Sequence, residues 1–303
     1  MELIEKALAK ARAQQEAARQ TATSGSAETV MAPADAGPAP EVASFAEEVA
    51  LADSPGRRTQ ATLDAIRYVR TRVQGVDQGH WLANRLVAAN STDKVADIFR
   101  ILRTKVLIPM RENGWQTLAV VGATPAVGKT TIASNLAMSI ALDANQSVLL
   151  VDADLRRPKV ASYFGLNPEI GLGDVLAGSA SLESALMNPG IERLVVLPSM
   201  GSLQNSTELL SSLRMQELLP ELRNRYASRI VIFDLPPLLA TGDTLAFLHN
   251  FDCALLVVEN GRNTAEELLE AKRLLQGTNF IGWVLNKGDP GAVGGYYHYG
   301  ATG

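Results

Sequence analysis

The chain has 303 residues, of which 47% are hydrophobic and 20% are charged, and its formal net charge is -4 at pH 7. This acidic balance leaves no basic footprint, so we expect nucleic acid not to be the main partner. No apolar run approaches the ~20 residues needed to span a bilayer, and the amino terminus lacks a signal-peptide core, so we expect a cytoplasmic protein. Cys253, the only cysteine, lies in an apolar run, which predicts a packed thiol and excludes an intrachain disulfide.

The amino-terminal part of the chain is poorly suited to forming a core. Residues 1–20 predict an amphipathic helix that is too short to be stable alone, and it either docks onto a partner or stays solvated. Residues 21–60, rich in Ala, Pro, Ser, Gly and Glu, predict a disordered linker. Residues 61–89 predict a partly helical connector, with a helix over residues 62–72.

A globular domain is predicted over residues 90–287, because apolar runs alternate with helical patterns from Thr117 onward. This alternation favours right-handed βαβ units, and so an α/β fold with a mostly parallel central sheet flanked by helices. Strands are predicted at residues 118–121, 148–151, 194–197, 230–233, 254–258 and 281–285. Helices are predicted at residues 129–142, 172–177, 207–225, 243–248 and 264–276.

A phosphate-binding loop is predicted between the first of these strands and the first helix, in the sequence VVGATPAVGKTT at positions 120–131. In such a loop the backbone N–H groups and the helix N-terminus point at polyphosphate oxygens. The pattern G-x-x-x-x-G-K-[ST] is not matched literally, because Ala123 occupies the first glycine position. The residues expected to bind the nucleotide are Ala126, Val127, Gly128, Lys129, Thr130, Thr131 and, after the last strand, Asn286.

Three carboxylates follow two of the predicted strands. Asp152 and Asp154 end the strand that begins near residue 148, and Asp234 ends the strand that begins near residue 230. Ligands of open parallel sheets bind beyond the carboxyl ends of the strands. We therefore expect the three acids to converge on the metal and phosphates held by Lys129 and Thr130.

These three motifs resemble the Walker A, A′ and B motifs of the bacterial tyrosine autokinases, which control capsule and exopolysaccharide export. The resemblance extends over roughly residues 90–299 and is closest to the soluble, exosortase-associated branch. The run 97–103 resembles the family's E-x-x-R-x-x-R helix, which mediates ring-shaped oligomers; the matching residues are Asp97, in place of glutamate, Arg100 and Arg103. The end of the chain resembles the family's tyrosine-rich tail, here with only Tyr296, Tyr297 and Tyr299 in residues 288–303, predicted to be flexible. Ala126 also departs from the family, which has glycine there.

The resemblance implies an ATP- and Mg²⁺-dependent protein-tyrosine kinase that acts on its own tail. Lys129 would bind the outer phosphates, and Thr130, Asp154 and Asp234 would hold Mg²⁺. Asp152 is the preferred acceptor of the tyrosine proton, although its role is exchangeable with that of Asp154. The adjacent Arg156 and Arg157 either stabilise transferred charge, contact a subunit or form a solvated salt bridge.

The resemblance also implies partners. The three tail tyrosines would accept phosphate in trans within a homo-oligomer. Phosphate charge that accumulates on adjacent tails would then favour dissociation of the oligomer. A membrane-embedded polysaccharide co-polymerase would be the activator and would recruit the protein to the inner face of the membrane.

The choice of nucleotide base and two other functions stay open on the sequence. The run Asn286-Lys287-Gly288-Asp289 matches the guanine-reading N-K-x-D of GTPases, but the second acidic motif is not D-x-x-G, so adenine is preferred. A partition or positioning ATPase would carry a second lysine at the place of Thr124 and, in its membrane-positioning class, a terminal basic amphipathic helix. A non-catalytic nucleotide switch in a polysaccharide-export complex agrees with the short tail and with Ala126.

Overall fold

A single sheet of eight strands organises the part of the chain that the computed structural model describes, residues 71–90, 93–143, 146–225 and 228–288. The strand order is β1-β4-β5-β3-β6-β2-β7-β8, and all neighbours are parallel except β4 and β5. The strands are β1 (Arg72–Val73), β2 (Thr117–Gly122), β3 (Ser147–Asp152), β4 (Met187–Asn188), β5 (Leu194–Leu197), β6 (Arg229–Asp234), β7 (Cys253–Glu259) and β8 (Asn279–Asn286).

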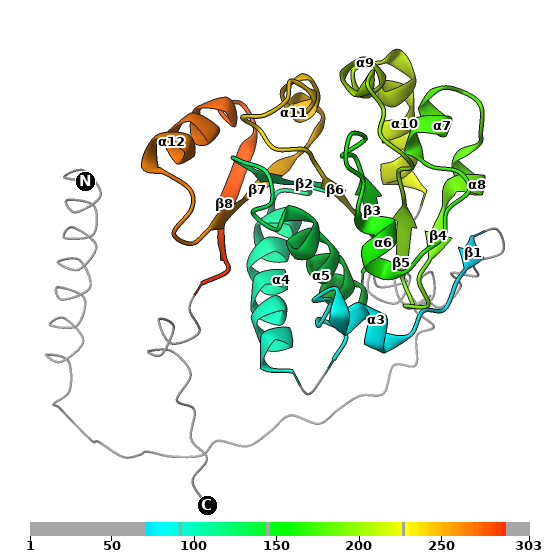
Figure 1. The fold of residues 1–303 in the computed structure, drawn as a ribbon, viewed down its shortest axis with the longest axis horizontal. Coiled ribbons are helices and arrows are strands. Elements are labelled where there is room, and N and C mark those ends of the chain that lie inside the picture. The colour runs from blue at the N-terminus through cyan, green and yellow to red at the C-terminus, as the bar shows by residue number, and fades with distance from the viewer. Residues whose placement is uncertain (1–70, 91–92, 144–145, 226–227, 289–303) are drawn as a thin grey trace, which may run out of the picture. The chain divides into compact units, whose positions relative to one another are not determined.

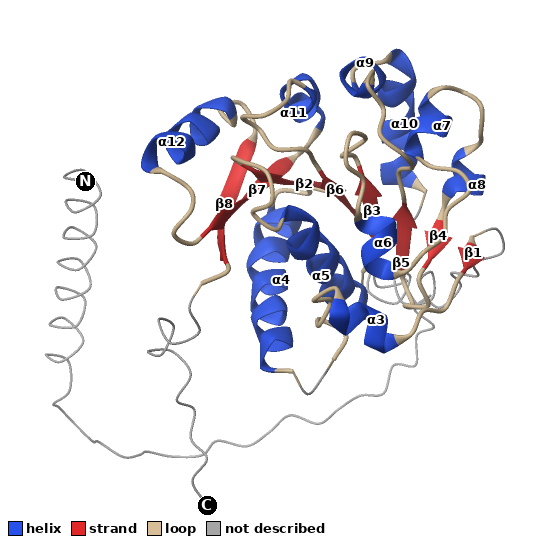
Figure 2. Ribbon diagram, viewed as in Figure 1, coloured by secondary structure: helices blue, strands red, loops and turns tan. Residues whose placement is uncertain are grey.

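Helices cover both faces of this sheet (Figure 1). One face carries α3 (Gln78–Ala83), α4 (Lys94–Glu112), α5 (Lys129–Ala141) and α6 (Val160–Phe164). The other carries α7 (Leu172–Leu176), α8 (Leu182–Ala185), α9 (Ser206–Leu210), α10 (Leu213–Asn224), α11 (Asp243–Phe247), the 3-10 turn Leu248–Asn250 and α12 (Ala265–Leu274). The predicted α/β fold with a mostly parallel sheet is confirmed (Figure 2).

The central strands are apolar on both sides because each side meets a helical layer. In β2, Leu118 and Val120 face the core beneath α4 and α5, whereas Ala119 and Val121 face the core beneath α10 to α12. The buried Cys253 of β7 belongs to the first of these cores, and burial raises the pKa of its thiol to about 12. The predicted packed thiol is thus confirmed.

The predicted strands and helices agree with the structure to within one to three residues at most ends. The exceptions have local causes. The helix predicted over residues 207–225 is two helices, because the hydroxyl of Ser212 accepts the N–H of Met215 and starts α10 anew. The helix predicted over residues 62–72 is wrong for Thr71, which lies in a bend, and for Arg72, which pairs with Met187 in the edge strand β1; residues 62–70 lie outside the described residues.

The two short strands and α3 were not predicted, and they add to the edge of the fold. Trp81 of α3 is 7% exposed, and its indole N–H donates to the carbonyl of Phe164 at 3.3 Å. This contact joins α3 to α6 on the same face as α5. The predictions for residues 1–20, 21–60 and 288–303 lie wholly or almost wholly outside the described residues.

No helix within the described residues is both long enough and apolar enough to cross a membrane.

Candidate nucleotide-binding site

The predicted phosphate loop connects β2 to α5 at the carboxyl edge of the sheet. Its tightest turn is at Gly128, the N-cap of α5, with φ of 95°. A Cβ atom there would lie 2.1 Å from Nδ2 of Asn286, so a larger residue would have to displace this amide as well as adopt a strained backbone. Ala126 also has a left-handed backbone, with φ of 64°. Glycine adopts this conformation at lower cost, which explains why alanine is an unusual choice at this position.

The end of β8 holds this loop in place. The Asn286 side chain donates from Nδ2 to the carbonyl of Val127 at 2.8 Å, and Nζ of Lys287 donates to the carbonyl of Ala126 at 3.0 Å. Lys287 also forms an ion pair with Glu259 at 3.0 Å. Asn286, predicted from the sequence as a base contact, therefore lies at the loop and lines its cavity.

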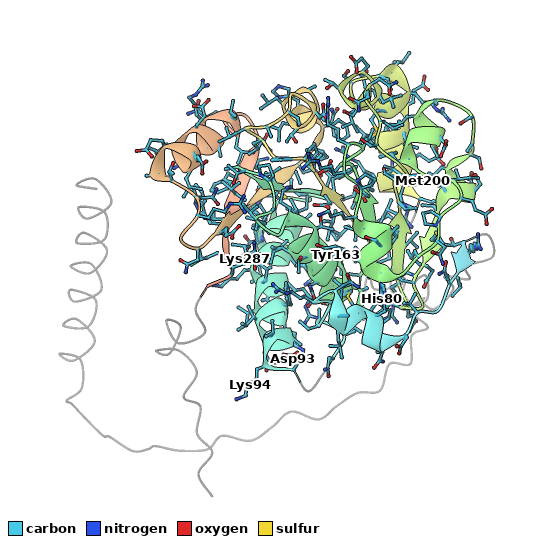
Figure 3. The ribbon with its side chains drawn as sticks, in the orientation of Figure 1. His80, Asp93, Lys94, Tyr163, Met200 and Lys287 are labelled. Atoms are coloured by element: carbon cyan, nitrogen blue, oxygen red, sulfur yellow. The ribbon has the colours of Figure 1, made fainter. Side chains whose placement is uncertain are left out.

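A cavity of about 670 Å³ opens in front of the loop, a volume in the usual range for small-molecule sites. Figure 3 labels two of the residues that line it, Tyr163 on α6 and Lys287 after β8. Among the described residues, six cationic side chains but only one carboxylate, that of Asp154, line the cavity; the cations are Arg85, Lys129, Arg156, Arg157, Lys159 and Lys287. The excess of positive charge suits a polyphosphate.

Lys129, Thr130 and Asp234 meet at the floor of the cavity. The Thr130 hydroxyl donates to Oδ2 of Asp234 at 2.6 Å. Burial lowers the pKa of the Lys129 ammonium, which is 7% exposed, while Asp234 and Asp154 oppose that shift. Burial likewise raises the pKa of Asp234 to about 6, against the opposing effects of Lys129 and Thr130.

The donor set at Asp234 fits a divalent cation. Its second oxygen, Oδ1, is buried and accepts no hydrogen bond from the described residues. A buried carboxylate oxygen without a partner is costly unless a cation or water meets it. Hydroxyl and carboxylate oxygens are the ligands that Mg²⁺ takes, together with the phosphates of a nucleotide.

The two aspartates of the second motif differ in environment. Asp152 is 0% exposed, pairs with Asp234 across β3 and β6, and accepts the N–H groups of Lys159 and Val160, each at 2.9 Å. Burial, followed by the charge of Asp234, raises the pKa of Asp152 well above its ordinary value. Asp154 instead lines the cavity, and its carboxylate accepts the N–H of Arg157 at 3.0 Å.

The arginine after Asp154 has a buried partner that the sequence did not reveal. Arg156 donates to both oxygens of Asp243, at 2.8 and 3.2 Å, and Asp243 is 0% exposed. The hydroxyls of Ser206 and Thr207 also donate to Asp243, and the hydrogen bonds from Arg156 and these hydroxyls lower the pKa of that carboxyl against the effect of burial. The ion pair fixes Arg156 at the cavity wall.

The predicted oligomer-contact residues lie on α4. Arg100 forms an ion pair with Asp97, and both side chains are largely exposed. Arg103 turns toward the neighbouring helix, where it donates to the carbonyl of Ser139 at 2.8 Å. The predicted phosphoacceptors Tyr296, Tyr297 and Tyr299 lie outside the described residues.

Several cavity residues had no signal in the sequence. Ala83, Asn84 and Arg85 reach it from the end of α3, and Lys159 and Tyr163 reach it from α6 and the residue before it. None belongs to a recognisable motif, and α3 ends at residue 83, well before the phosphate-loop sequence that begins at residue 120.

Comparisons with known proteins identify close relatives of this arrangement. The model of the AAA domain family matches residues 116–271. Tyrosine-protein kinase YwqD of Bacillus subtilis (strain 168) is 34% identical over 204 residues, which are 67% of this chain and 85% of that protein. Tyrosine-protein kinase etk of Escherichia coli (strain K12) is 37% identical over 203 residues, 66% of this chain.

The matched region is a small part of some relatives. This chain spans 28% of the length of etk and 29% of the putative tyrosine-protein kinase EpsB of Ralstonia solanacearum. The solved kinase domain of Escherichia coli tyrosine kinase ETK is similar with a TM-score of 0.62 and 34% identity, covering 71% of this chain and 88% of that domain. The similarity thus falls on the kinase domain of that protein.

Proposed function

Because the chain belongs to the AAA domain family and, within it, to the bacterial tyrosine-protein kinases, we propose that it transfers the γ-phosphoryl group of ATP to protein tyrosine side chains. The observation that carries this proposal is the pairing of Thr130 with the buried Asp234, whose free oxygen fits Mg²⁺, on the floor of a strongly cationic cavity. Phosphoryl transfer asks a protein mainly for such positioning and charge neutralisation.

In this proposal, Lys129 binds the outer phosphates, and Thr130 and Asp234 hold Mg²⁺. Asp154 reaches the metal through water, which leaves its carboxylate free to accept a proton. Bound Mg²⁺ neutralises charge on the phosphate oxygens. The backbone N–H groups from Ala126 to Thr131 cradle the phosphates at the start of α5.

The proton acceptor that we propose is Asp154, the second of the two aspartates considered for this role from the sequence. Asp154 lines the cavity, whereas both oxygens of Asp152 accept backbone N–H groups beneath it. The tyrosine oxygen forms a bond to the γ-phosphorus as the bond to the β–γ bridging oxygen breaks. The phenol proton, with a pKa of about 10 in a free tyrosine, passes to the carboxylate.

The acceptors would be Tyr296, Tyr297 and Tyr299 of a neighbouring copy, brought together through the exposed face of α4 with Asp97 and Arg100. The last described residues lie beside the phosphate loop, since Lys287 contacts Ala126. We further propose that a membrane-embedded polysaccharide co-polymerase recruits and activates the protein at the inner face of the membrane. The activity would then regulate exopolysaccharide or capsule polymerisation and export.

Mass spectrometry of the purified chain tests this function. Incubation with Mg-ATP should place phosphate on the tail tyrosines, more so when a candidate partner's cytoplasmic segment is added. Asp154→Asn should reduce phosphate incorporation far more than ATP affinity. Asp152→Asn is the matched control variant, because it removes a carboxylate that lies outside the cavity. Release of ADP without phosphotyrosine would instead indicate a nucleotide-hydrolysing switch.

A further inference from the structure

The segment between α3 and α4 forms part of the nucleotide cavity through Arg85. The buried side chain of Asn135, on α5, fixes this segment with three hydrogen bonds. Its Oδ1 accepts the N–H groups of Val87 and Ala88 at 2.8 and 3.0 Å, and its Nδ2 donates to the carbonyl of Arg85 at 2.8 Å. Arg85 is thereby held against the helix that carries the phosphate loop.

Two hydrogen bonds of the same amide limit the distance between Arg85 and the start of α5. Nδ2 of Asn135 also donates to the carbonyl of Thr131 at 2.9 Å, so the Arg85 and Thr131 carbonyl oxygens lie less than about 6 Å apart. Thr131 is the third residue of α5, whose N-terminal N–H groups face the phosphates. An extended arginine side chain spans such a separation.

The backbone of Arg85 is strained, with φ of 60°. A left-handed conformation is unfavourable for a non-glycine residue, and such residues cluster at functional sites. Glycine or asparagine would adopt it at lower cost. The choice of arginine at this position therefore calls for a reason other than the turn.

The guanidinium group of Arg85 supplies that reason. It is exposed, lines the cavity, and has no hydrogen bond or ion pair with any other described residue. Arg156, by contrast, is engaged by Asp243. A planar cation with free N–H donors at the wall of a polyphosphate cavity matches phosphate oxygens in charge and shape.

We propose that Arg85 is a nucleotide-binding residue that contacts a phosphate group of bound ATP and that Asn135 is its positioning residue. The inference rests on the proposed function, because it assumes ATP in this cavity. It extends the site to a segment outside the three motifs and outside the residues 116–271 that the family model matches.

Titration calorimetry of Mg-ATP with variants at Arg85 tests the proposal. Arg85→Gly and Arg85→Asn should weaken ATP binding by about tenfold or more, the usual loss for a charge-assisted hydrogen bond, while the melting temperature stays unchanged or rises as strain is relieved. Arg85→Lys should retain more of the affinity than Arg85→Gly, since it keeps the charge. The same series with ADP and AMP identifies the phosphate group that Arg85 contacts.

Arg193 offers a matched control. It is also an arginine with a left-handed backbone, φ of 64°, but it does not line the cavity. Arg193→Gly removes the same strain and should leave ATP affinity unchanged. Equal ATP affinity in Arg85→Asn and the unaltered chain, or equal losses in Arg85→Lys and Arg85→Gly, would overturn the inference while the kinase proposal stands. If the unaltered chain failed to bind ATP, both would be overturned.

Discussion

Asp234→Asn is expected to stabilise the ligand-free protein at pH 8 although it removes a metal ligand. Burial raises the pKa of Asp234 to about 6 in the folded protein, whereas an aspartate in an unfolded chain titrates near ~3.9. The folded state therefore binds more protons than the unfolded state between these two values. Stability contributed by the protonated carboxyl is lost as pH rises through this window.

The size of the effect follows from the pKa difference. A shift of about two units corresponds to about 3 kcal/mol of unfolding free energy at pH values well above 6. At pH 5 the unfolded chain is already ionised while the folded protein is not, so about half of this cost is present. The other half, about 1.5 kcal/mol, develops between pH 5 and pH 8. Asparagine keeps the shape of the side chain without the charge.

Urea denaturation followed by circular dichroism measures this difference. Both proteins are unfolded at pH 5, 6, 7 and 8 without Mg²⁺ or nucleotide, and groups that do not sense the charge of Asp234 cancel in the comparison. Asp152, whose pKa that charge raises, shifts the difference in the same direction. The stability of Asp234→Asn relative to the unaltered protein should increase by about 1.5 kcal/mol from pH 5 to pH 8. Saturating Mg-ATP should reverse the order, because only the unaltered site gains binding energy. A difference that stays constant across this range would refute the reasoning.

Three further outcomes are expected. Lys129→Ala should weaken ATP binding by about ten- to a hundredfold with the fold intact by circular dichroism, because it removes the buried charge that faces the phosphates; unchanged autophosphorylation would contradict the site assignment. ATP should bind at least about tenfold more tightly than GTP in calorimetry, a difference of about 1.4 kcal/mol, and the reverse order would indicate a GTPase. Arg100→Glu, which places like charge beside Asp97 on the exposed face of α4, should give smaller particles in light scattering and make tail phosphorylation steeply dependent on protein concentration. A smaller particle with undiminished, concentration-independent phosphorylation would indicate transfer within one chain.

The carboxyl edge of the sheet was predictable because each of its acids directly follows an apolar strand. Runs of four or more apolar residues fix the strands, and the parallel order then brings Asp152 and Asp234 into register. The family resemblance seen in the three motifs is confirmed by the tyrosine-protein kinases that this chain matches. The strands, the acids at their ends and the three motifs can each be recognised from a short stretch of sequence.

The partners of the site were not predictable because they depend on contacts between distant segments. Arg156 and Asp243 are 87 positions apart, and Asn135 meets the carbonyl of Arg85 across 50 positions. The strands β1 and β4 have two residues each, too few for a periodic pattern. The different surroundings of Asp152 and Asp154 likewise arise from α6, a five-residue helix without a clear sequence signal.

The contacts of β8 with the phosphate loop bear on how the protein matures during synthesis. Residues 122–131 leave the ribosome about 150 positions before Asn286 and Lys287, and a chain is made at roughly 5–20 residues per second. For many seconds the nascent loop lacks the two side chains that hold the carbonyls of Ala126 and Val127. Tight nucleotide binding therefore indicates that the last strand has joined the sheet. A chain that ends before β8 would contain all three sequence motifs of the kinase, but its phosphate loop would lack the two hydrogen bonds from Asn286 and Lys287.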